Sequence, residues 1–345
     1  MSWLTWRQYR IQFVAVAALL AVFGAVLLVS GLQLAAQWNA VVAACRTGDA
    51  CANQPPPPLD IGLANDLTVL GLLVPAALGI LWGAPLAGAE FESGAVNFAW
   101  SQSITRTRWL VVKAGWVLCT AAVVGGVVSA LLTWWSGPRN AATADALRAT
   151  VFDTQGVVPV AYAVFAVALG IAMGVLLRRT VPAVAVTLAG FVGVRLVVAQ
   201  FLRPHLVPAT TAYSSPLSGT WPFPQGPDLI LSSGMAGRYG HPIPEVFTRE
   251  VASVPVSYLS ATCQKLAAPF TYSGQPGDIQ PAGHPSSATQ KLIDSCIQAS
   301  GVRNYVSYQP ASHYWPLQFA EAGIFVALAA AFTGIAFLVL RHRDA

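Results

Sequence analysis

Two ionisable residues, Arg195 and Glu321, lie inside long apolar stretches of the sequence. A charged side chain is costly in an apolar, membrane-like environment, so such residues are functional candidates and usually pair with one another. At 1.5 Å per helical residue, Arg195 lies roughly 25 Å from Arg178. Glu321 lies roughly 30 Å from Arg341, which gives it a similar depth. We therefore expect an Arg195–Glu321 pair that closes one side of a pathway; the alternative is that each extends separately towards the polar surface.

Residue patterns for other kinds of chemistry are missing from the sequence. It contains no Gly-x-x-x-x-Gly-Lys-Ser/Thr phosphate-binding loop, no His-Glu-x-x-His pair and no Gly-x-Ser-x-Gly turn. The histidines of the segment 202–316 are dispersed, which argues against a metal site. We therefore expect no catalytic residue, no metal and no cofactor in this chain.

The composition indicates a membrane protein. Of the 345 residues 55% are hydrophobic and 10% charged, and the mean hydropathy is +0.58, whereas soluble domains carry about 25% charged residues. Helices of about 20 apolar residues cross the roughly 30 Å hydrocarbon core of a bilayer. Six runs are long enough: about 12–35, 66–87, 110–134, 157–177, 181–201 and 317–340. The expected fold is an all-α polytopic membrane protein with six transmembrane helices.

The positive charges of the short loops predict the orientation. One side carries Arg7, Arg10, Arg106, Arg108, Lys113, Arg178, Arg179, Arg341 and Arg343. The short loops of the opposite side carry Arg46, Arg139 and Arg148. Because six spans put both termini on one side, we expect a multi-pass plasma-membrane protein with both termini in the cytoplasm. The net charge of +5 mostly reflects this bias and does not favour nucleic acid as a partner.

The runs divide the chain into four parts: 1–11, 12–201, 202–316 and 317–345. Residues 1–11 combine aromatic and basic side chains, which predicts either a short interfacial helix or an aromatic belt at the start of the first span. Residues 12–201 hold the first five spans, and 317–345 the sixth span with a cytoplasmic tail. The segment 202–316 is rich in Pro, Gly, Ser and Tyr, and we expect it to form an extracellular domain between the fifth and sixth spans.

Two local patterns predict how some spans meet. Only three residues, Arg178-Arg179-Thr180, separate the fourth and fifth spans, which predicts a tight hairpin. Gly170 and Gly174 give the fourth span a small-residue face for close packing against a neighbouring helix. Within the segment 202–316, residues 249–266 and 288–299 are expected to form short helices.

Four of the five cysteines lie in segments that we expect outside the cell. Cys45 and Cys51 lie in the first external loop, and Cys263 and Cys296 in the segment 202–316, whereas Cys119 lies alone in the third span. Paired cysteines on an oxidising side suggest disulfides Cys45–Cys51 and Cys263–Cys296. The alternative is that these thiols are free.

The loop 88–109 is a polar segment between two long apolar runs and has basic residues near its end. From its residues alone it is either an ordinary loop that obeys the charge bias or a rigid element projecting from two spans at the cytoplasmic face. Trp100 and Trp109 are expected to hold it at the membrane interface.

The same loop resembles that between the second and third spans of actinobacterial ABC-2-type transporter permeases. The resemblance rests on Glu92-Ser-Gly and on Trp100-Ser-Gln-Ser-Ile-Thr-Arg106-Thr-Arg108-Trp109. Thr5-Trp-Arg-Gln is similar to the opening signature of that family, and Tyr308–Glu321 to the stretch that enters the last span. Two positions depart from the pattern: His313 stands where Arg is expected, and Ala95 where Thr is frequent.

The resemblance implies the permease subunit of an ATP-driven exporter, which forms its pathway as a dimer in the bilayer. The partners would be a second permease copy or paralogue and separate ABC ATPase subunits, which bind ATP and Mg. The residues assigned to ATPase coupling are Trp6, Arg7, Glu90, Glu92, Gly94, Trp100, Gln102, Arg106 and Arg108. The alternative is a non-transporting membrane sensor or scaffold whose extracellular domain binds a ligand.

Overall fold

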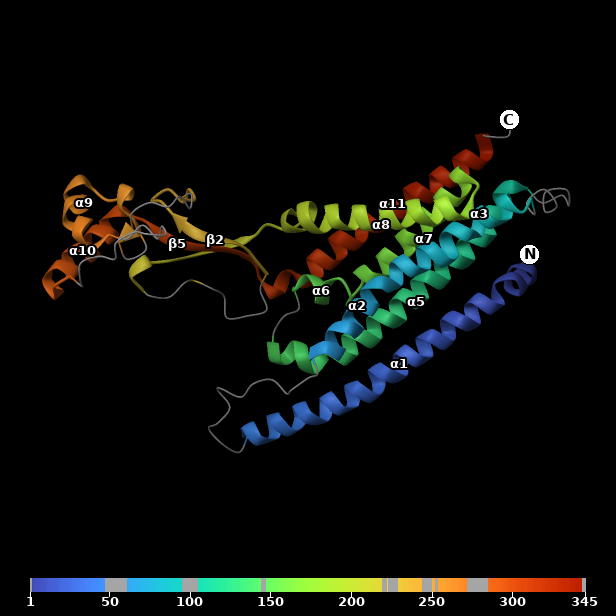
Figure 1. Cartoon of the computed structure of the whole chain (residues 1–345), viewed down its shortest axis with the longest axis horizontal. Helices are drawn as coiled ribbons and strands as arrows, with labels where there is room; N and C mark the ends of the chain where they lie inside the picture. The colour runs from blue at the N-terminus through green and yellow to red at the C-terminus, as the bar shows by residue number, and fades with distance from the viewer. Residues whose placement is uncertain are drawn as a thin grey trace. The chain divides into compact units, whose positions relative to one another are not determined.

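A computed structural model of the chain describes residues 2–46, 61–94, 105–143, 147–218, 222, 229–243, 250–251, 254–271 and 285–342. The chain divides into two compact units (Figure 1). One, the membrane unit, comprises Met1–Val207 and Ser312–Ala345. The other, the inserted unit, comprises Pro208–Ala311.

The membrane unit is helical. Its helices are α1 (Ser2–Arg46), α2 (Ile61–Leu78), α3 (Ala84–Glu92), α5 (Arg106–Thr143), α6 (Ala149–Phe152), α7 (Val158–Leu177), α8 (Thr180–Val197) and α11 (Tyr314–His342). A π-helical turn, η2 (Gly79–Gly83), joins α2 to α3, and a second, η3 (Val198–Leu202), extends α8 into the short 3-10 turn η4 (Arg203–His205). Six segments are long and apolar enough to span a membrane: Val16–Ala40, Asp66–Glu92, Thr107–Pro138, Val158–Leu177, Thr180–His205 and Ala311–His342. The six predicted spans are therefore confirmed.

Helix α7 is the centre of the membrane unit, because α3, α5, α8 and α11 all pack against it. Glycines let α7 approach the α2–α3 segment with almost no space between the backbones. A Cβ atom on Gly170 would lie 2.6 Å from the carbonyl oxygen of Gly79, and one on Gly174 would lie 2.6 Å from that of Ala84. The close packing predicted from Gly170 and Gly174 is therefore confirmed.

Helix α1 starts at Ser2 and continues without a break to Arg46. Residues 2–11 are thus helical, but they form the first turns of α1 rather than a separate interfacial helix. The helix also extends about eleven residues beyond the end of the first predicted apolar run, near residue 35. Figure 1 shows α1 running along one side of the membrane unit, beside α5.

The hairpin between α7 and α8 is as tight as predicted. Helix α7 ends at Leu177 and α8 begins at Thr180. Arg178 closes α7 in the left-handed region, with φ 53°, and its N–H donates to the carbonyl oxygen of Gly174 at 3.1 Å. A non-glycine residue adopts this conformation only where the surrounding chain fixes it.

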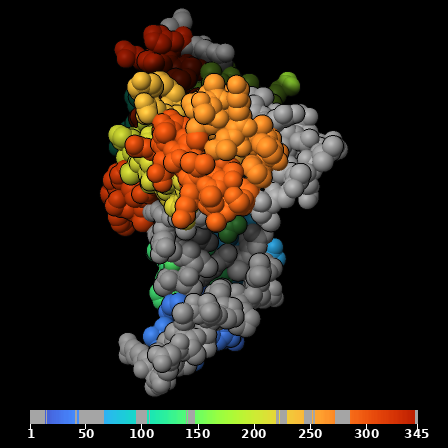
Figure 2. Space-filling view, turned by 90° about the vertical axis from the view of Figure 1, so that its left-hand side faces the viewer, coloured from blue at the N-terminus to red at the C-terminus, as the bar shows by residue number. Residues whose placement is uncertain are grey.

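The inserted unit contains a three-stranded antiparallel sheet in the order β1-β5-β2. Its strands are β1 (Thr210–Ser214), β2 (Leu229–Ala236) and β5 (Arg303–Gln309), and a two-stranded ribbon pairs β3 (Glu250–Val251) with β4 (Val254–Pro255). Helices α9 (Ala261–Ala267) and α10 (Ser287–Ser300) pack beside them, and their residues form much of the orange surface in Figure 2. The strands were not predicted, and of the helix expected over 249–266 only the last part forms.

A disulfide joins Cys263 of α9 to Cys296 of α10, which confirms that predicted pair. Around it lies a core of Ile293, Ile297, Val302, Val254, Leu259 and other apolar residues. The predicted Cys45–Cys51 pair cannot be placed in the same way, since Cys51 lies outside the described residues.

Candidate functional site

A group of buried charged side chains lies at one end of the membrane unit. Glu321 of α11 is 0% exposed and accepts two hydrogen bonds from Arg203, from Nε at 2.7 Å and from Nη2 at 2.8 Å. The hydroxyl of Tyr162 on α7 donates to Glu321 at 2.5 Å. A guanidinium that holds a carboxylate with two parallel N–H groups forms one of the strongest hydrogen-bonded pairs in proteins.

Asp153 extends this group to α8. It follows the short helix α6 and accepts a hydrogen bond from Nη2 of Arg195 at 2.9 Å. Its other carboxylate oxygen pairs with Arg203, which therefore bridges two carboxylates. Arg195 also lies over the ring of Tyr162, 4.8 Å from its centroid. We call Asp153, Tyr162, Arg195, Arg203 and Glu321 the buried charge network; its two arginines balance its two carboxylates.

The π-turn η3 explains how one helix supplies both arginines. In a regular α-helix, the residue eight positions after Arg195 would point about 80° away from it. A π-turn accommodates one extra residue. Arg203 therefore has the direction that the seventh residue after Arg195 would have in a regular helix, which is two turns further along nearly the same face. Both guanidinium groups therefore reach Asp153.

Gln318, one turn before Glu321, fixes the backbone beside the network. Its side-chain oxygen accepts hydrogen bonds from the N–H groups of Val157 and Val158, both at 3.0 Å, at the start of α7. Its amide nitrogen donates to the carbonyl oxygens of Phe152 at 3.0 Å and Gln155 at 3.1 Å. Since Gln318 is 0% exposed and all these bonds are made, α11 and the turn that carries Asp153 form one rigid part.

Aromatic rings pack against the network. Tyr162 contacts Phe325 with ring centroids 4.6 Å apart, and Phe165 contacts Phe325 at 5.2 Å and Phe191 at 6.1 Å. Phe165, Phe191 and Phe325 are all buried and come from α7, α8 and α11. The charges are thus held against an apolar layer, where an ion that lost its partner would be strongly destabilising.

The predicted pairing of Arg195 with Glu321 is wrong. The two residues belong to the same network, but Arg195 pairs with Asp153 and Glu321 with Arg203. The sequence reasoning missed Asp153 and Arg203 because both fall just outside the predicted apolar runs, 157–177 and 181–201. The one available signal was that each carries a charge next to the end of a span, where it can reach back into the bundle.

A second group of contacts, at the opposite end of α7, holds the last turn of α3, where the 88–109 loop starts. Glu90 pairs with Lys113 of α5, whose side chain is only 7% exposed. The ammonium group of Lys113 also lies 5.0 Å from the ring centroid of Trp109. A buried ion pair therefore joins the end of α3 to α5.

The neighbouring residues join the same turn to α7 and α8. Glu92 accepts a hydrogen bond at 3.0 Å from the N–H of Thr180, the first residue of α8, where a helix favours negative charge. Phe91 packs edge-on against Trp109, with centroids 6.4 Å apart, and the guanidinium of Arg178 lies 5.3 Å from the Phe91 ring. We call Glu90, Phe91, Glu92, Trp109 and Lys113 the loop base.

The loop re-enters the bundle at the start of α5. Thr105 precedes this helix, and its hydroxyl oxygen accepts a hydrogen bond from the N–H of Arg108 at 3.4 Å. Arg106 and Arg108 thus occupy the first turn of α5, where the helix dipole disfavours cations. Arg108 is exposed and makes no ion pair with any described residue. We therefore expect its charge not to stabilise α5.

The other residues assigned to coupling have different outcomes. Gly94 follows α3 with φ +72°, a conformation that favours glycine. Trp6 and Arg7 lie in the first turns of α1, and Trp100 and Gln102 lie outside the described residues. Trp109 is 1% exposed and packs against Phe91 and Lys113 inside the bundle, so it holds the end of the loop through contacts within the protein.

A family model described as ABC-2 membrane transporter related matches residues 17–203, more than half of the 345 residues. The chain belongs to this family. No curated protein and no solved structure was found to match it.

Membership in the ABC-2 membrane transporter related family indicates a multi-pass membrane subunit for transport, which works with ATPase subunits. The match covers the first five spans and the loop base and ends at Arg203, so it includes four of the five network residues. Glu321 and the whole inserted unit lie beyond it. Within the part of the chain that the structure describes, no cluster of three or more His, Cys, Asp or Glu residues could hold a metal ion.

Proposed function

We propose that the chain is the permease subunit of an ATP-driven ABC-2-type exporter. Two membrane units form the pathway between them, and separate cytosolic ATPase subunits drive it. The family match, the six apolar spans and the arginines at the loop-base end support this proposal. The charge bias favours the cytoplasm for that end and for both termini.

The observation that carries the proposal is the way the loop base is attached. Three consecutive residues of α3, Glu90 to Glu92, contact α5, the end of α7 and the start of α8. A force applied to the loop would therefore move several spans together rather than bend one loop. Arg108 projects beside this attachment and has no described partner of opposite charge, so it is suited to an acidic surface on an ATPase.

The buried charge network closes the other end of the same bundle in this proposal. Tyr162 in the network and Arg178 at the loop base lie about 24 Å apart along α7. Because α7 contacts nearly every other span, rotation of α5 and α8 at the loop base would strain the Arg203–Glu321 pair. ATP binding to the partner would then shift the population between states with the network closed and open.

Co-purification tests the proposal. The chain is expressed in a lipid environment together with candidate ABC ATPases from the same genome. One of these ATPases is expected to elute with it at a ratio of one ATPase to one permease. Arg108→Gln is expected to weaken the complex, while Arg341→Gln, an exposed arginine of α11, serves as the charge-matched control. Absence of a complex with any ABC ATPase would contradict the proposal.

The second candidate is a membrane sensor or scaffold. It is favoured by the inserted unit, which has its own core and disulfide and lies outside the family match. The same purification separates the two candidates, because a sensor requires no ATPase in a stoichiometric complex.

A further inference from the structure

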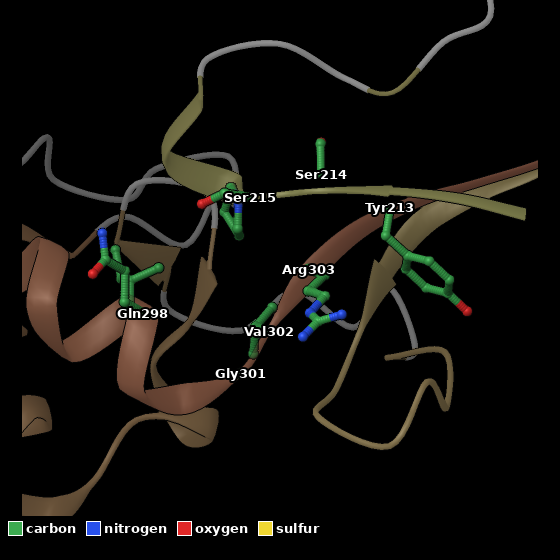
Figure 3. A pocket seen from close by; sticks show the side chains of 9 residues that line it. Tyr213, Ser214, Ser215, Gln298, Gly301, Val302 and Arg303 are labelled. Atoms are coloured by element: carbon green, nitrogen blue, oxygen red, sulfur yellow. The ribbon is translucent and has the colours of Figure 1, made fainter.

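The inserted unit contains a pocket of about 350 Å³ where the end of β1 meets the C-terminal turn of α10. Its lining comes from three segments: Tyr213–Pro216, Ile297–Gln298 and Gly301–Arg303. Figure 3 shows Gln298 on one side of the pocket and Tyr213 and Arg303 on the other. The volume is at the lower end of the range for small-molecule sites, roughly 300–1,000 Å³.

The walls of this pocket are fixed by covalent and backbone constraints. The disulfide Cys263–Cys296 anchors α10 at the residue just before Ile297. Gly301 ends the helix with φ +74° and turns the chain directly into β5. Ser215 closes the opposite wall, since its hydroxyl accepts a hydrogen bond from the N–H of Leu217 at 3.3 Å. A pocket with such walls loses little entropy when it binds a ligand.

The lining combines apolar surface with three polar side chains that have no partner among the described residues. Ile297 and Val302, 1% and 4% exposed, belong to the core beneath the pocket and hold its floor in place. The apolar surface that a ligand can reach comes from the Tyr213 ring, which is 48% exposed, and from Pro216. The side chains of Tyr213, Gln298 and Arg303 make no hydrogen bond or ion pair with any described residue. An apolar surface with a few convergent polar groups is the usual composition of a ligand site.

The charge of the pocket is positive. None of the described residues that line it is acidic, and Arg303 is exposed at its rim. The negative end of α10 does not compete for Arg303, because Arg238 donates to the carbonyl oxygen of Ala299 at 3.0 Å. Arg238 also packs on Gly301, where an added Cβ would lie 3.0 Å from it. Arg303 is thus left as the cation that faces a ligand.

We infer that this pocket binds a small amphipathic organic anion. Its apolar part lies against the Tyr213 ring and Pro216, and its carboxylate or phosphate pairs with Arg303, whose planar fork matches either group. This site goes beyond the proposed permease function and does not depend on it, since it lies wholly within the inserted unit.

Ligand-observed NMR with the full-length chain in lipid nanodiscs tests the inference, with empty nanodiscs as the reference. The probes are 4-phenylbutyrate, 3-phenylpropyl phosphate and the uncharged 4-phenylbutanamide. At least one anion is expected to bind about fivefold or more tightly than the amide. The tighter of the two anions identifies the headgroup that the site prefers.

Substitutions locate the binding. Arg303→Gln is expected to reduce the affinity for the anion to that of the amide, and Tyr213→Ser to weaken all probes. Lys265→Gln removes a charge from an exposed position of α9 outside the pocket and is expected to change nothing. Equal binding of anion and amide, or unchanged anion binding by Arg303→Gln with an intact thermal transition, overturns the inference.

Discussion

The two ends of the membrane unit hold their charges differently. At the Glu321 end, both arginines and both carboxylates of the network are paired and largely buried. At the loop-base end, Lys113 and Glu90 form a comparable buried pair, but Glu92 and Arg108 are exposed. Buried pairs resist separation because each ion left alone is costly, whereas exposed charges are free to meet a partner. One end is therefore suited to closing a bundle and the other to receiving a force.

Arg203→Met, at the Glu321 end, is expected to have the largest effect on the stability of the membrane unit. It leaves the fully buried Glu321 without its cation, which should destabilise the fold by about 3–5 kcal/mol. The thermal midpoint of the purified chain in nanodiscs measures it. The double variant Arg203→Met, Glu321→Gln is the control and should recover most of the loss. A single variant as stable as the wild type would show that the network is solvated.

The close contact between α7 and the α2–α3 segment is expected to give the second-largest effect on stability. Gly170→Ala places a Cβ 2.6 Å from the Gly79 carbonyl oxygen, so the backbones must separate, at a cost of about 1–3 kcal/mol. Gly193→Ala on α8 is the matched control, because its Cβ would meet no atom within 4 Å. Equal thermal midpoints for the two variants would contradict the close α3–α7 packing.

Two glutamates of the loop base allow the loss of a buried charge and the loss of an exposed charge to be compared at the same end of the membrane unit. Glu90→Gln leaves the buried Lys113 without a carboxylate, and we expect a loss of about 1–2 kcal/mol. Glu92→Gln removes only an exposed contact to the start of α8, so its thermal midpoint should fall by less. A larger loss for Glu92→Gln would reverse our assignment of the structural role to Glu90.

Arginines at opposite ends of two helices are expected to give the smallest changes in thermal midpoint, in opposite directions. Arg108→Gln removes a cation from the first turn of α5 and should leave the thermal midpoint unchanged or slightly higher. Arg341→Gln removes one from the last turn of α11, where the dipole favours it, and should lower the midpoint slightly. The two melting curves are compared in the same lipid. A clear loss for Arg108→Gln would mean that this residue stabilises the fold.

Features that depend on local sequence were predictable. Apolar run length predicted the six spans, glycine spacing predicted the α7 contact, and the Arg178 hairpin followed from the short connection between two runs. Features that depend on how the spans pack against one another could not be predicted from the sequence. The partner of Glu321 is Arg203 rather than Arg195 because a π-turn changes the helix register, and periodicity does not reveal such a turn.

The remaining differences have similar physical causes. Trp109 is buried because α3 extends to Glu92 and covers it with Phe91, so the loop leaves the bundle later than the apolar run suggested. In the inserted unit, β1, β2 and β5 are five, eight and seven residues long, and β3 and β4 have two residues each. Strands β3 and β4 are too short to show alternation, and in β2 a register shift between Ile230 and Ser232 interrupts it.

ATP hydrolysis by the complex tests the central claim, that the loop base couples the membrane unit to an ATPase. The complex of the chain with the ABC ATPase that co-purifies with it is reconstituted in lipid, and the wild type is compared with Arg108→Gln and Arg341→Gln. We predict that Arg108→Gln abolishes the stimulation of ATP hydrolysis by the membrane subunit. Arg341→Gln should stimulate hydrolysis nearly as much as the wild type, and both variants should keep a thermal midpoint near that of the wild type. Full stimulation by Arg108→Gln, or equal losses in both variants, would contradict coupling through the loop base.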